Sequence, residues 1–324
     1  MLRPARKLRT TPVSRKSALL GAAALGAALA LTSTSAQANT TAQADTTAPR
    51  HYVALGDSYA AGAGVPGQSA GLCLRSDHNY GSLVASTLKA AAYTDVTCSA
   101  AKISAMTEPQ YAGMEWGGTA QLDAVTGDTD LVTVGIGGND LGTSPLGIAE
   151  VIATCIGGTV VNPQGTPCKD VYNHGHWEWD WSSWSWTWQY GTDDLVDRIN
   201  GAAPRLADVL NRIHTKAPNA RVLVVGYPSV VPADGSTCSE RQPVTPGDVE
   251  YLHDTLGRLN AMLSSTATAN GATYVDTATP TTGHDICSDD RWIEGALPTS
   301  PAAPFHPNAT GEKVMADTVL ATLR

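Results

Sequence analysis

The stretch HYVALGDSY, residues 51–59, decides the fold: an apolar, β-rich run ends in Gly56, and Ser58 follows where a helix would begin. Strands of parallel sheets end in this way, and ligands bind beyond their carboxyl ends. Four similar runs lie at 93–97, 131–136, 222–225 and 273–275. Helix-like stretches alternate with these runs, so the sequence predicts a three-layer α/β/α fold with about five parallel strands.

Three amphipathic stretches carry the clearest helix signals. One begins at Thr245, an N-cap followed by a proline at the first helical position. Another begins at 192–194 and contains Pro204, where a proline can kink or divide a helix. A third follows Asn308. Residues 139–191 show no long helical or strand pattern, so we interpret them as an insertion, either functional or decorative.

Length and charge restrict the class of protein. The 324 residues are 42% apolar, enough for one sizeable core, and we expect a single domain over residues 51–324. Without residues 1–38, 15 Lys and Arg side chains face 30 Asp and Glu, a net charge of −15. Phosphate contacts need clustered cations, so this balance excludes a nucleic-acid binder.

The N-terminus has the pattern of an export signal. A basic start precedes the apolar run 18–31 and the cleavage-like triplet Ala36-Gln37-Ala38, so residues 1–38 are expected to be a secretory signal peptide. The run has 14 residues, whereas a membrane-spanning helix needs about 20. We expect residues 39–50 to be a flexible leader, and the mature protein to be a secreted, extracellular monomer.

Six cysteines follow the signal, and an even count in an exported chain indicates disulfides. Of the 15 connectivities we expect the sequential one, which pairs Cys73 with Cys98, Cys155 with Cys168, and Cys238 with Cys287. The C-x-x-C spacing that is typical of metal sites does not occur among these cysteines. The run Gly62 to Gly67 matches G-x-G-x-x-G only loosely, because it lies several residues past the strand and contains Pro66. We therefore expect neither a metal nor a cofactor.

Two further segments carry chemically useful side chains. Asn139 lies in GIGGND, residues 135–140, at the end of a strand, where its amide could donate to a developing oxyanion. His306 lies in PFHPN, residues 304–308, and Pro307 restrains its loop before the last helix. Each residue also has an interpretation without catalysis. Asn139 could belong to an ordinary Asn turn, His306 could be a histidine without a special role, and Ser58 could only cap a helix.

Taken together, these segments resemble the SGNH (GDSL-type) hydrolases, and in particular their secreted actinobacterial lipases and esterases. The matching blocks are Gly56-Asp57-Ser58-Tyr59, Gly137-Gly138-Asn139-Asp140, His306-Pro307-Asn308 and the run Cys73-Leu74-Arg75-Ser76-Asp77-His78-Asn79-Tyr80. The resemblance implies a flavodoxin-like fold and two-step ester hydrolysis, with Ser58 as nucleophile and His306 as base. The oxyanion hole would consist of the N–H groups of Ser58 and Ala100 and the Asn139 amide. G-x-S-x-G, the α/β-hydrolase signature, is absent around Ser58.

Two positions depart from the family pattern. A glycine usually lines the oxyanion hole where this chain has Ala100, whose methyl would tighten the acyl pocket. Many members carry an Asp three residues before the histidine, where this chain has Ala303. The carbonyl of Ala303 is then expected to orient the imidazole, which leaves a Ser-His dyad.

Six of the eight tryptophans crowd into the insertion, whose Trp-rich part covers about residues 170–191: Trp177, Trp179, Trp181, Trp184, Trp186 and Trp188. The first three and the last three of these tryptophans each alternate with polar residues. This period predicts two strands, joined in a hairpin that turns at Ser182-Ser183. The rings either pack on the domain as a buttress or form a projecting arm that contacts lipid or sugar.

The function predicted from the sequence is therefore a secreted lipase or esterase acting on a lipid or small ester. Phospholipase A-type activity and deacetylation of polysaccharide are the enzyme alternatives. A binding module without activity, whose tryptophans grip carbohydrate or membrane, is the alternative from another class.

Overall fold

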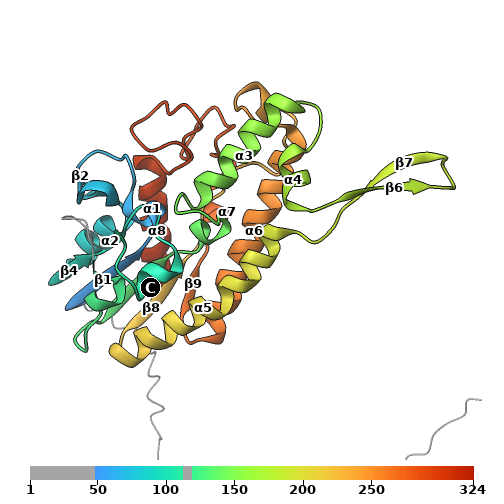
Figure 1. Ribbon diagram of the computed structural model, residues 1–324. Helices are drawn as coiled ribbons and strands as arrows, with labels where there is room; N and C mark the ends of the chain where they lie inside the picture. Colours follow the sequence, from blue (N-terminus) through green and yellow to red (C-terminus); the bar gives the residue numbers. More distant parts are fainter. Residues whose placement is uncertain (1–47, 112–118) are drawn as a thin grey trace, which may run out of the picture. The chain divides into compact units, whose positions relative to one another are not determined.

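The computed structural model describes residues 48–111 and 119–324 (Figure 1). The predicted signal peptide and most of the leader lie outside the described residues. Arg50, which the sequence places in the leader, donates from its backbone N–H and its guanidinium to Asp130 at 2.7 and 2.9 Å. This end of the leader therefore belongs to the folded body.

Five parallel strands form the central sheet in the order β4-β1-β5-β8-β9, which confirms the predicted fold. The strands are β1 (His51–Gly56), β4 (Ala92–Asp95), β5 (Leu131–Gly135), β8 (Arg221–Val225) and β9 (Thr273–Val275). Gly56 pairs with Gly135, so the strands that precede Ser58 and Asn139 are neighbours and end together.

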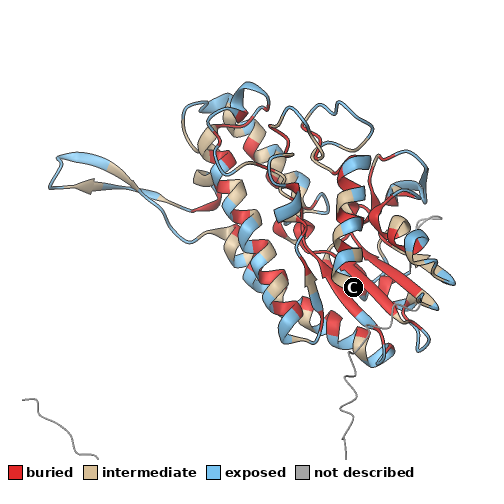
Figure 2. Cartoon of the chain, turned by 180° about the vertical axis from the view of Figure 1, so that it is seen from behind, coloured by how far each residue is buried: buried red, intermediate tan, exposed pale blue. Residues whose placement is uncertain are grey.

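Alternate strand residues fill two cores, one on each face of the sheet. Val53 and Leu55 face α3 (Ile148–Val161), α5 (Asp194–Lys216) and α6 (Pro246–Ala269). Tyr52 and Ala54 face α2 (Tyr80–Leu88) and α8 (Ala309–Leu323). Figure 2 shows the three middle strands of the sheet, β1, β5 and β8, as almost wholly buried.

The helix starts agree with the sequence signals. Thr245 caps α6 by accepting from the N–H of Asp248, and Asn308 caps α8 by accepting from Thr310 and Gly311. Asp193 caps α5, which runs unbroken through Pro204. Packing of its apolar face against the sheet compensates for the hydrogen bond that the proline lacks.

One long helix escaped the sequence analysis. Residues 139–191 contain α3, 14 residues with the sequence IAEVIATCIGGTVV. Ile148, Val151, Ile152, Cys155 and Ile156 recur at 3–4 spacing and share one face, so the sequence did carry a helix signal, which Gly157-Gly158 and apolar residues on the other faces weaken. The remaining short elements are α1 (Ser58–Ala61), α4 (Pro167–Tyr172), α7 (Ala278–Thr281), β2 (Gln68–Ser69), β3 (Arg75–Ser76) and 3-10 turns at Gly71–Cys73, Ile103–Met106, Gln121–Ala124, Gly138–Leu141 and Cys238–Glu240.

All three predicted cysteine pairs are joined as disulfides, Cys73–Cys98, Cys155–Cys168 and Cys238–Cys287. The tryptophan hairpin is also present, as β6 (His176–Asp180) and β7 (Ser185–Gln189), and its turn spans residues 181–184. It extends away from the helices and the sheet (Figure 1), which contradicts the buttress interpretation. No helix in the described part of the chain is long and apolar enough to span a bilayer.

Candidate active site

Ser58 is the first residue of α1, directly beyond β1. Asp57 caps this helix by accepting from the N–H of Tyr59 at 3.0 Å, and its own N–H donates to the carbonyl of Gly135 at 2.9 Å. Gly56 has φ +153, and a Cβ there would lie 2.4 Å from the Gly135 oxygen. Only glycine permits this close approach of the two strands, which fixes where Ser58 emerges.

His306 reaches Ser58 from the far end of the chain. Its Nε2 lies 2.7 Å from Ser58 Oγ, and its Nδ1 lies 2.7 Å from the carbonyl oxygen of Pro304. The structure thus corrects the expected partner, Ala303. The Ala303 carbonyl instead accepts from the backbone N–H of His306 at 3.2 Å and closes a turn, so it is engaged with the backbone.

The proton positions on His306 follow from these partners. A carbonyl oxygen only accepts, so Nδ1 carries the proton and Nε2 accepts from the Ser58 hydroxyl. Burial lowers the pKa of His306, while the hydrogen bond to Pro304 opposes this shift. The imidazole therefore stays neutral, and able to take a proton, at a lower pH than an ordinary histidine.

The glycine-rich loop holds the His306 segment in place. Gly64 has φ +82, and a Cβ there would lie 2.3 Å from the backbone nitrogen of Ala303. That nitrogen donates to the carbonyl of Ala63 at 2.7 Å, and the Tyr59 hydroxyl donates to the carbonyl of Phe305 at 2.6 Å. The Gly62–Gly67 run thus allows two backbones to meet beside the site.

The three expected oxyanion donors follow strands β1, β4 and β5, at the same edge of the parallel sheet. Within residues 48–111 and 119–324, the N–H groups of Ser58 and Ala100 have no protein acceptor. Asn139 Nδ2 donates one proton to the Ala101 carbonyl at 3.0 Å, and its Oδ1 accepts from the N–H of Ile148 at 3.2 Å. These two bonds orient the buried amide, and no acceptor among the described residues meets its second proton.

Ala100 adopts φ +62, the left-handed region that favours glycine. The departure from the family glycine therefore costs backbone strain, of roughly 1–2 kcal/mol for an alanine. Ala100 does not line the apolar pocket at Tyr59 and Phe305, so the tighter acyl pocket stays a prediction.

Residues 54–314 match the model of the GDSL-like lipase/acylhydrolase family. The chain belongs to this family. Lipase 2 of Streptomyces coelicolor is 40% identical over 277 residues, which cover 84% of this chain and 85% of that protein. The resemblance inferred from the sequence blocks is thereby confirmed, and the protein is an ester hydrolase.

Solved structures agree with this assignment. Phospholipase A1 from Streptomyces albidoflavus NA297 superposes with a TM-score of 0.63 at 28% identity, covering 86% of this chain and all of that one. An extracellular lipase from Streptomyces rimosus superposes with a TM-score of 0.64 at 24% identity, covering 85% of this chain and 99% of that one. The second likeness supports the α/β/α fold.

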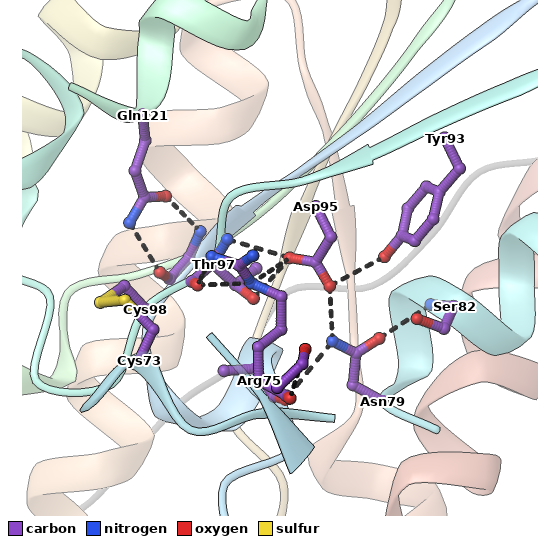
Figure 3. A network of polar contacts seen from close by, with 12 residues as sticks. Cys73, Arg75, Asn79, Ser82, Tyr93, Asp95, Thr97, Cys98 and Gln121 are labelled. Atoms are coloured by element: carbon purple, nitrogen blue, oxygen red, sulfur yellow. Dashed lines mark hydrogen bonds and ion pairs between the residues drawn. A yellow bond between two sulfur atoms is a disulfide. The ribbon is translucent and has the colours of Figure 1, made fainter. Parts of the chain in front are cut away.

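In this family member, the block that begins at Cys73 braces the loop carrying Ala100 (Figure 3). Arg75 donates from Nε and Nη2 to the Thr97 carbonyl at 2.9 and 2.8 Å and lies 3.3 Å from Asp95. Asn79, the cap of α2, donates to the same Asp95 at 2.7 Å.

Two backbone bonds complete this brace at the end of β1. The N–H of Cys98 donates to Gly56 at 3.0 Å, and the N–H of Ser99 donates to Cys73 at 3.0 Å. Gln121 grips Gly56 on both sides, accepting from its N–H at 2.8 Å and donating to its carbonyl at 2.9 Å (Figure 3). The strand end before Ser58 and the loop before Ala100 are therefore held together.

Sequence reasoning missed Tyr227, which links two of the family's blocks. Its hydroxyl accepts from the N–H of Gly138 at 2.7 Å and donates to Asp57 Oδ2 at 2.5 Å. Burial raises the pKa of Asp57 to about 7, while the bond from Tyr227 opposes that rise. Tyr227 thus positions the neighbours of both Ser58 and Asn139, and no local sequence pattern indicates a contact across 170 residues.

Replacing Tyr227 with phenylalanine is expected to lower kcat about tenfold, because a buried hydrogen bond to a carboxylate is lost and Gly138 is released. The pKa of Asp57 should rise further, so the acid limb of the pH profile of kcat should move to higher pH. Tyr251→Phe is the matched control, since it removes a bond between Tyr251 and Asp193 at 3.1 Å, away from Ser58. If the acid limb of the pH profile does not move in Tyr227→Phe, Tyr227 contributes packing only.

An apolar pocket of about 110 Å³ adjoins the site. Tyr59 and Phe305, the neighbours of Ser58 and His306, form one part of its lining. Residues of α3 such as Val151 and Ile156, together with Leu256 of α6, form the rest. Such a lining excludes water and favours a hydrocarbon group.

Proposed function

We propose that this protein hydrolyses carboxylic esters with apolar acyl chains through a covalent acyl-Ser58 intermediate. The observation that supports this most directly is the 2.7 Å hydrogen bond between Ser58 Oγ and His306 Nε2, with Nδ1 held by the Pro304 carbonyl. A nucleophile and base in this arrangement, with the base oriented by a third group, is typical of acyl transfer.

The reaction begins with proton transfer. His306 Nε2 takes the hydroxyl proton of Ser58 as Oγ bonds to the ester carbonyl carbon, and the carbonyl oxygen becomes an oxyanion. The N–H groups of Ser58 and Ala100 and the free amide proton of Asn139 stabilise that oxyanion. The carbonyl then reforms as the bond to the alkoxy oxygen breaks, and His306 donates its proton to the departing alcohol.

Water completes the cycle. His306 takes a proton from water as the water oxygen attacks the acyl-Ser58 carbonyl, and the same donors stabilise the second oxyanion. The bond to Oγ breaks, the proton returns to Ser58, and the carboxylic acid leaves. Each step uses only groups of the chain and water.

The pocket supports a lipid ester as the substrate. An acyl chain would occupy the apolar space beside Tyr59 and Phe305, whereas an acetyl group would leave most of it unused. The names of the relatives, lipase and phospholipase A1, point to the same substrate class. Polysaccharide deacetylation is therefore the weaker alternative.

We also propose that the protein acts outside the cell. Three disulfides persist in an oxidising compartment, the Streptomyces rimosus lipase is extracellular by its name, and residues 1–38 have the pattern of a signal peptide.

A substrate panel tests the proposal: p-nitrophenyl esters from acetate to palmitate, phosphatidylcholine and acetylated xylan. We expect kcat/KM to rise with acyl length until the pocket is filled. Ile156→Trp should then lower kcat/KM for the longer esters about tenfold while acetate is little affected, because the larger ring occupies the pocket. Preference for acetylated xylan, or an equal loss on every ester, would contradict the proposal.

A further inference from the structure

The hairpin of β6 and β7 has two chemically different faces. Trp177 pairs with Trp188 and Trp179 with Trp186, so four rings share one face. The other face carries His176, Glu178, Asp180, Ser185, Thr187 and Gln189. A ribbon with this alternation is built to lie with one side against apolar material.

The tryptophan face is largely uncovered by the described parts of the chain, and only Trp179 and Trp188 are half-buried. Trp177 and Trp186 are 62% and 61% exposed, and Trp181 and Trp184 in the turn are 74% and 72% exposed. Figure 2 shows most of the hairpin as exposed. A contiguous exposed apolar face of this kind marks an interaction surface.

The ring geometry argues against sugar as the partner. Cross-strand neighbours meet edge to face, with interplanar angles of 71° for Trp177 and Trp188 and 73° for Trp179 and Trp186. The turn rings, Trp181 and Trp184, cross at 78°. Stacking along a sugar chain needs ring faces that lie parallel to it, whereas a ridge of crossed rings presents mainly apolar edges.

Charge narrows the choice of lipid. From residue 169 to 191 the chain has three acidic side chains, Asp170, Glu178 and Asp180, and one basic one, Lys169, whose Nζ lies 4.2 Å from the Tyr190 ring centroid. An anionic membrane would repel this segment. Indole rings favour the headgroup level of a bilayer, where their apolar body and polar N–H are both accommodated.

The turn limits how deeply the hairpin can enter. Asp180 accepts from the N–H and hydroxyl of Ser182 at 2.8 and 2.7 Å and from the hydroxyl of Ser183 at 2.7 Å. These bonds lower the pKa of Asp180 to about 2, so it is charged at neutral pH. A charged turn between two tryptophans suits shallow, interfacial contact rather than insertion into the hydrocarbon core.

The base of the hairpin adjoins the proposed acyl pocket. It follows α4, which the Cys155–Cys168 disulfide ties to α3, and Cys155 lines the pocket. Val160 and Val161 on α3 and Val171 on α4 are 83%, 85% and 54% exposed. Exposed apolar side chains are therefore also present on α4, which precedes the hairpin, and on α3, which lines the pocket.

We propose that the tryptophan face of the hairpin docks on the surface of a zwitterionic phospholipid bilayer and holds the pocket at that surface. This inference rests on the proposed function for its biological sense, but the docking itself is a separate physical property. On this proposal, the hairpin recognises the surface of the lipid bilayer that contains the substrate.

Vesicles of diether phosphatidylcholine test the docking, because ether lipids have no ester to hydrolyse. Wild type should bind them in sedimentation assays, with a blue shift of tryptophan fluorescence. Trp181→Ser combined with Trp184→Ser should weaken the partition about tenfold or more, since the two most exposed rings are lost. Thr187→Ser, on the polar face, is the matched control and should bind as wild type does.

A second variant guards against misfolding of the serine variant. The N–H of Gly191 donates to the Asn173 carbonyl at 2.7 Å, so the ends of the hairpin are close and a short Gly-Ser linker can replace residues 175–190. This chain should also lose binding. Glu178→Lys should raise binding to ether-lipid vesicles containing phosphatidylserine about fivefold.

Several outcomes would overturn the docking. They are wild-type binding by the linker variant, binding of wild type to xylan or emulsified triglyceride but not to the vesicles, and a dimer that the tryptophan substitutions dissociate. A wild type that hydrolyses esters but does not bind the vesicles removes the docking alone. Vesicle binding by a wild type that hydrolyses no ester removes the proposed function alone.

Discussion

Ser58→Ala and His306→Ala are each expected to lower kcat for soluble p-nitrophenyl butyrate by about 10⁴-fold or more. Alanine at 58 removes the atom that bonds to the acyl carbon, and alanine at 306 removes the base 2.7 Å from it. The two groups act as one unit, so the double variant should be hardly slower than either single variant.

Matched controls separate chemistry from folding in this experiment. Ser229 follows β8 at the same edge of the sheet as Ser58, and His284 stacks on Trp292 with ring centroids 3.4 Å apart. Ser229→Ala and His284→Ala should keep most of the activity. Melting temperatures of Ser58→Ala and His306→Ala close to wild type would show that the fold is intact. Substantial turnover by either would refute the assigned nucleophile or base.

Asn139→Ala is expected to lower kcat by about 10²–10³-fold, the usual effect of removing one oxyanion donor. KM should change little, because the interaction strengthens only as charge develops on the carbonyl oxygen. Affinity for a boronic acid that forms a tetrahedral adduct with Ser58 should fall in parallel with kcat. That parallel fall is the signature of a transition-state contact.

Asn139 also supports the structure, so its prediction needs a control. It bonds to the Ala101 carbonyl and the N–H of Ile148, and losing these bonds will lower the melting temperature. Asn173 is another buried asparagine, bonded to Lys169 and Asp193 through Nδ2. Asn173→Ala should lower stability while kcat stays within about twofold. Similar kcat for Asn139→Ala and Asn173→Ala would make Asn139 a structural residue only.

Much of the fold and part of the site could be predicted because their signals are local. Gly56 and the apolar run before it mark a buried strand and its end, and Pro307 and Asn308 mark the loop of His306 and the start of α8. The hairpin pairing could also be predicted, because alternation of tryptophan with polar residues has the period of a strand.

The features of the fold and site that were not predicted depend on backbone angles or on contacts between distant residues. Phe305 adopts φ +64, which helps decide that Pro304 rather than Ala303 meets the imidazole. Sequence does not reveal such an angle at a phenylalanine. Tyr227 meets Asp57 only after the sheet has formed. Helix α3 has a 3–4 apolar spacing along the face that lines the pocket, but apolar residues on its other faces blur that signal.

The acceptor for the imidazole is a main-chain carbonyl, and this changes how the site can evolve. Every amino acid supplies that oxygen, so no side-chain change at position 304 deletes it. In members with an acidic third residue, a single codon change removes the partner. Here the Pro304 carbonyl loses contact with the imidazole only if the loop changes its path. Insertions and deletions between residues 295 and 306 should therefore be the harmful changes. Mutations that change the length or path of the segment 295–306 should therefore break this contact, whereas substitution of one side chain should not.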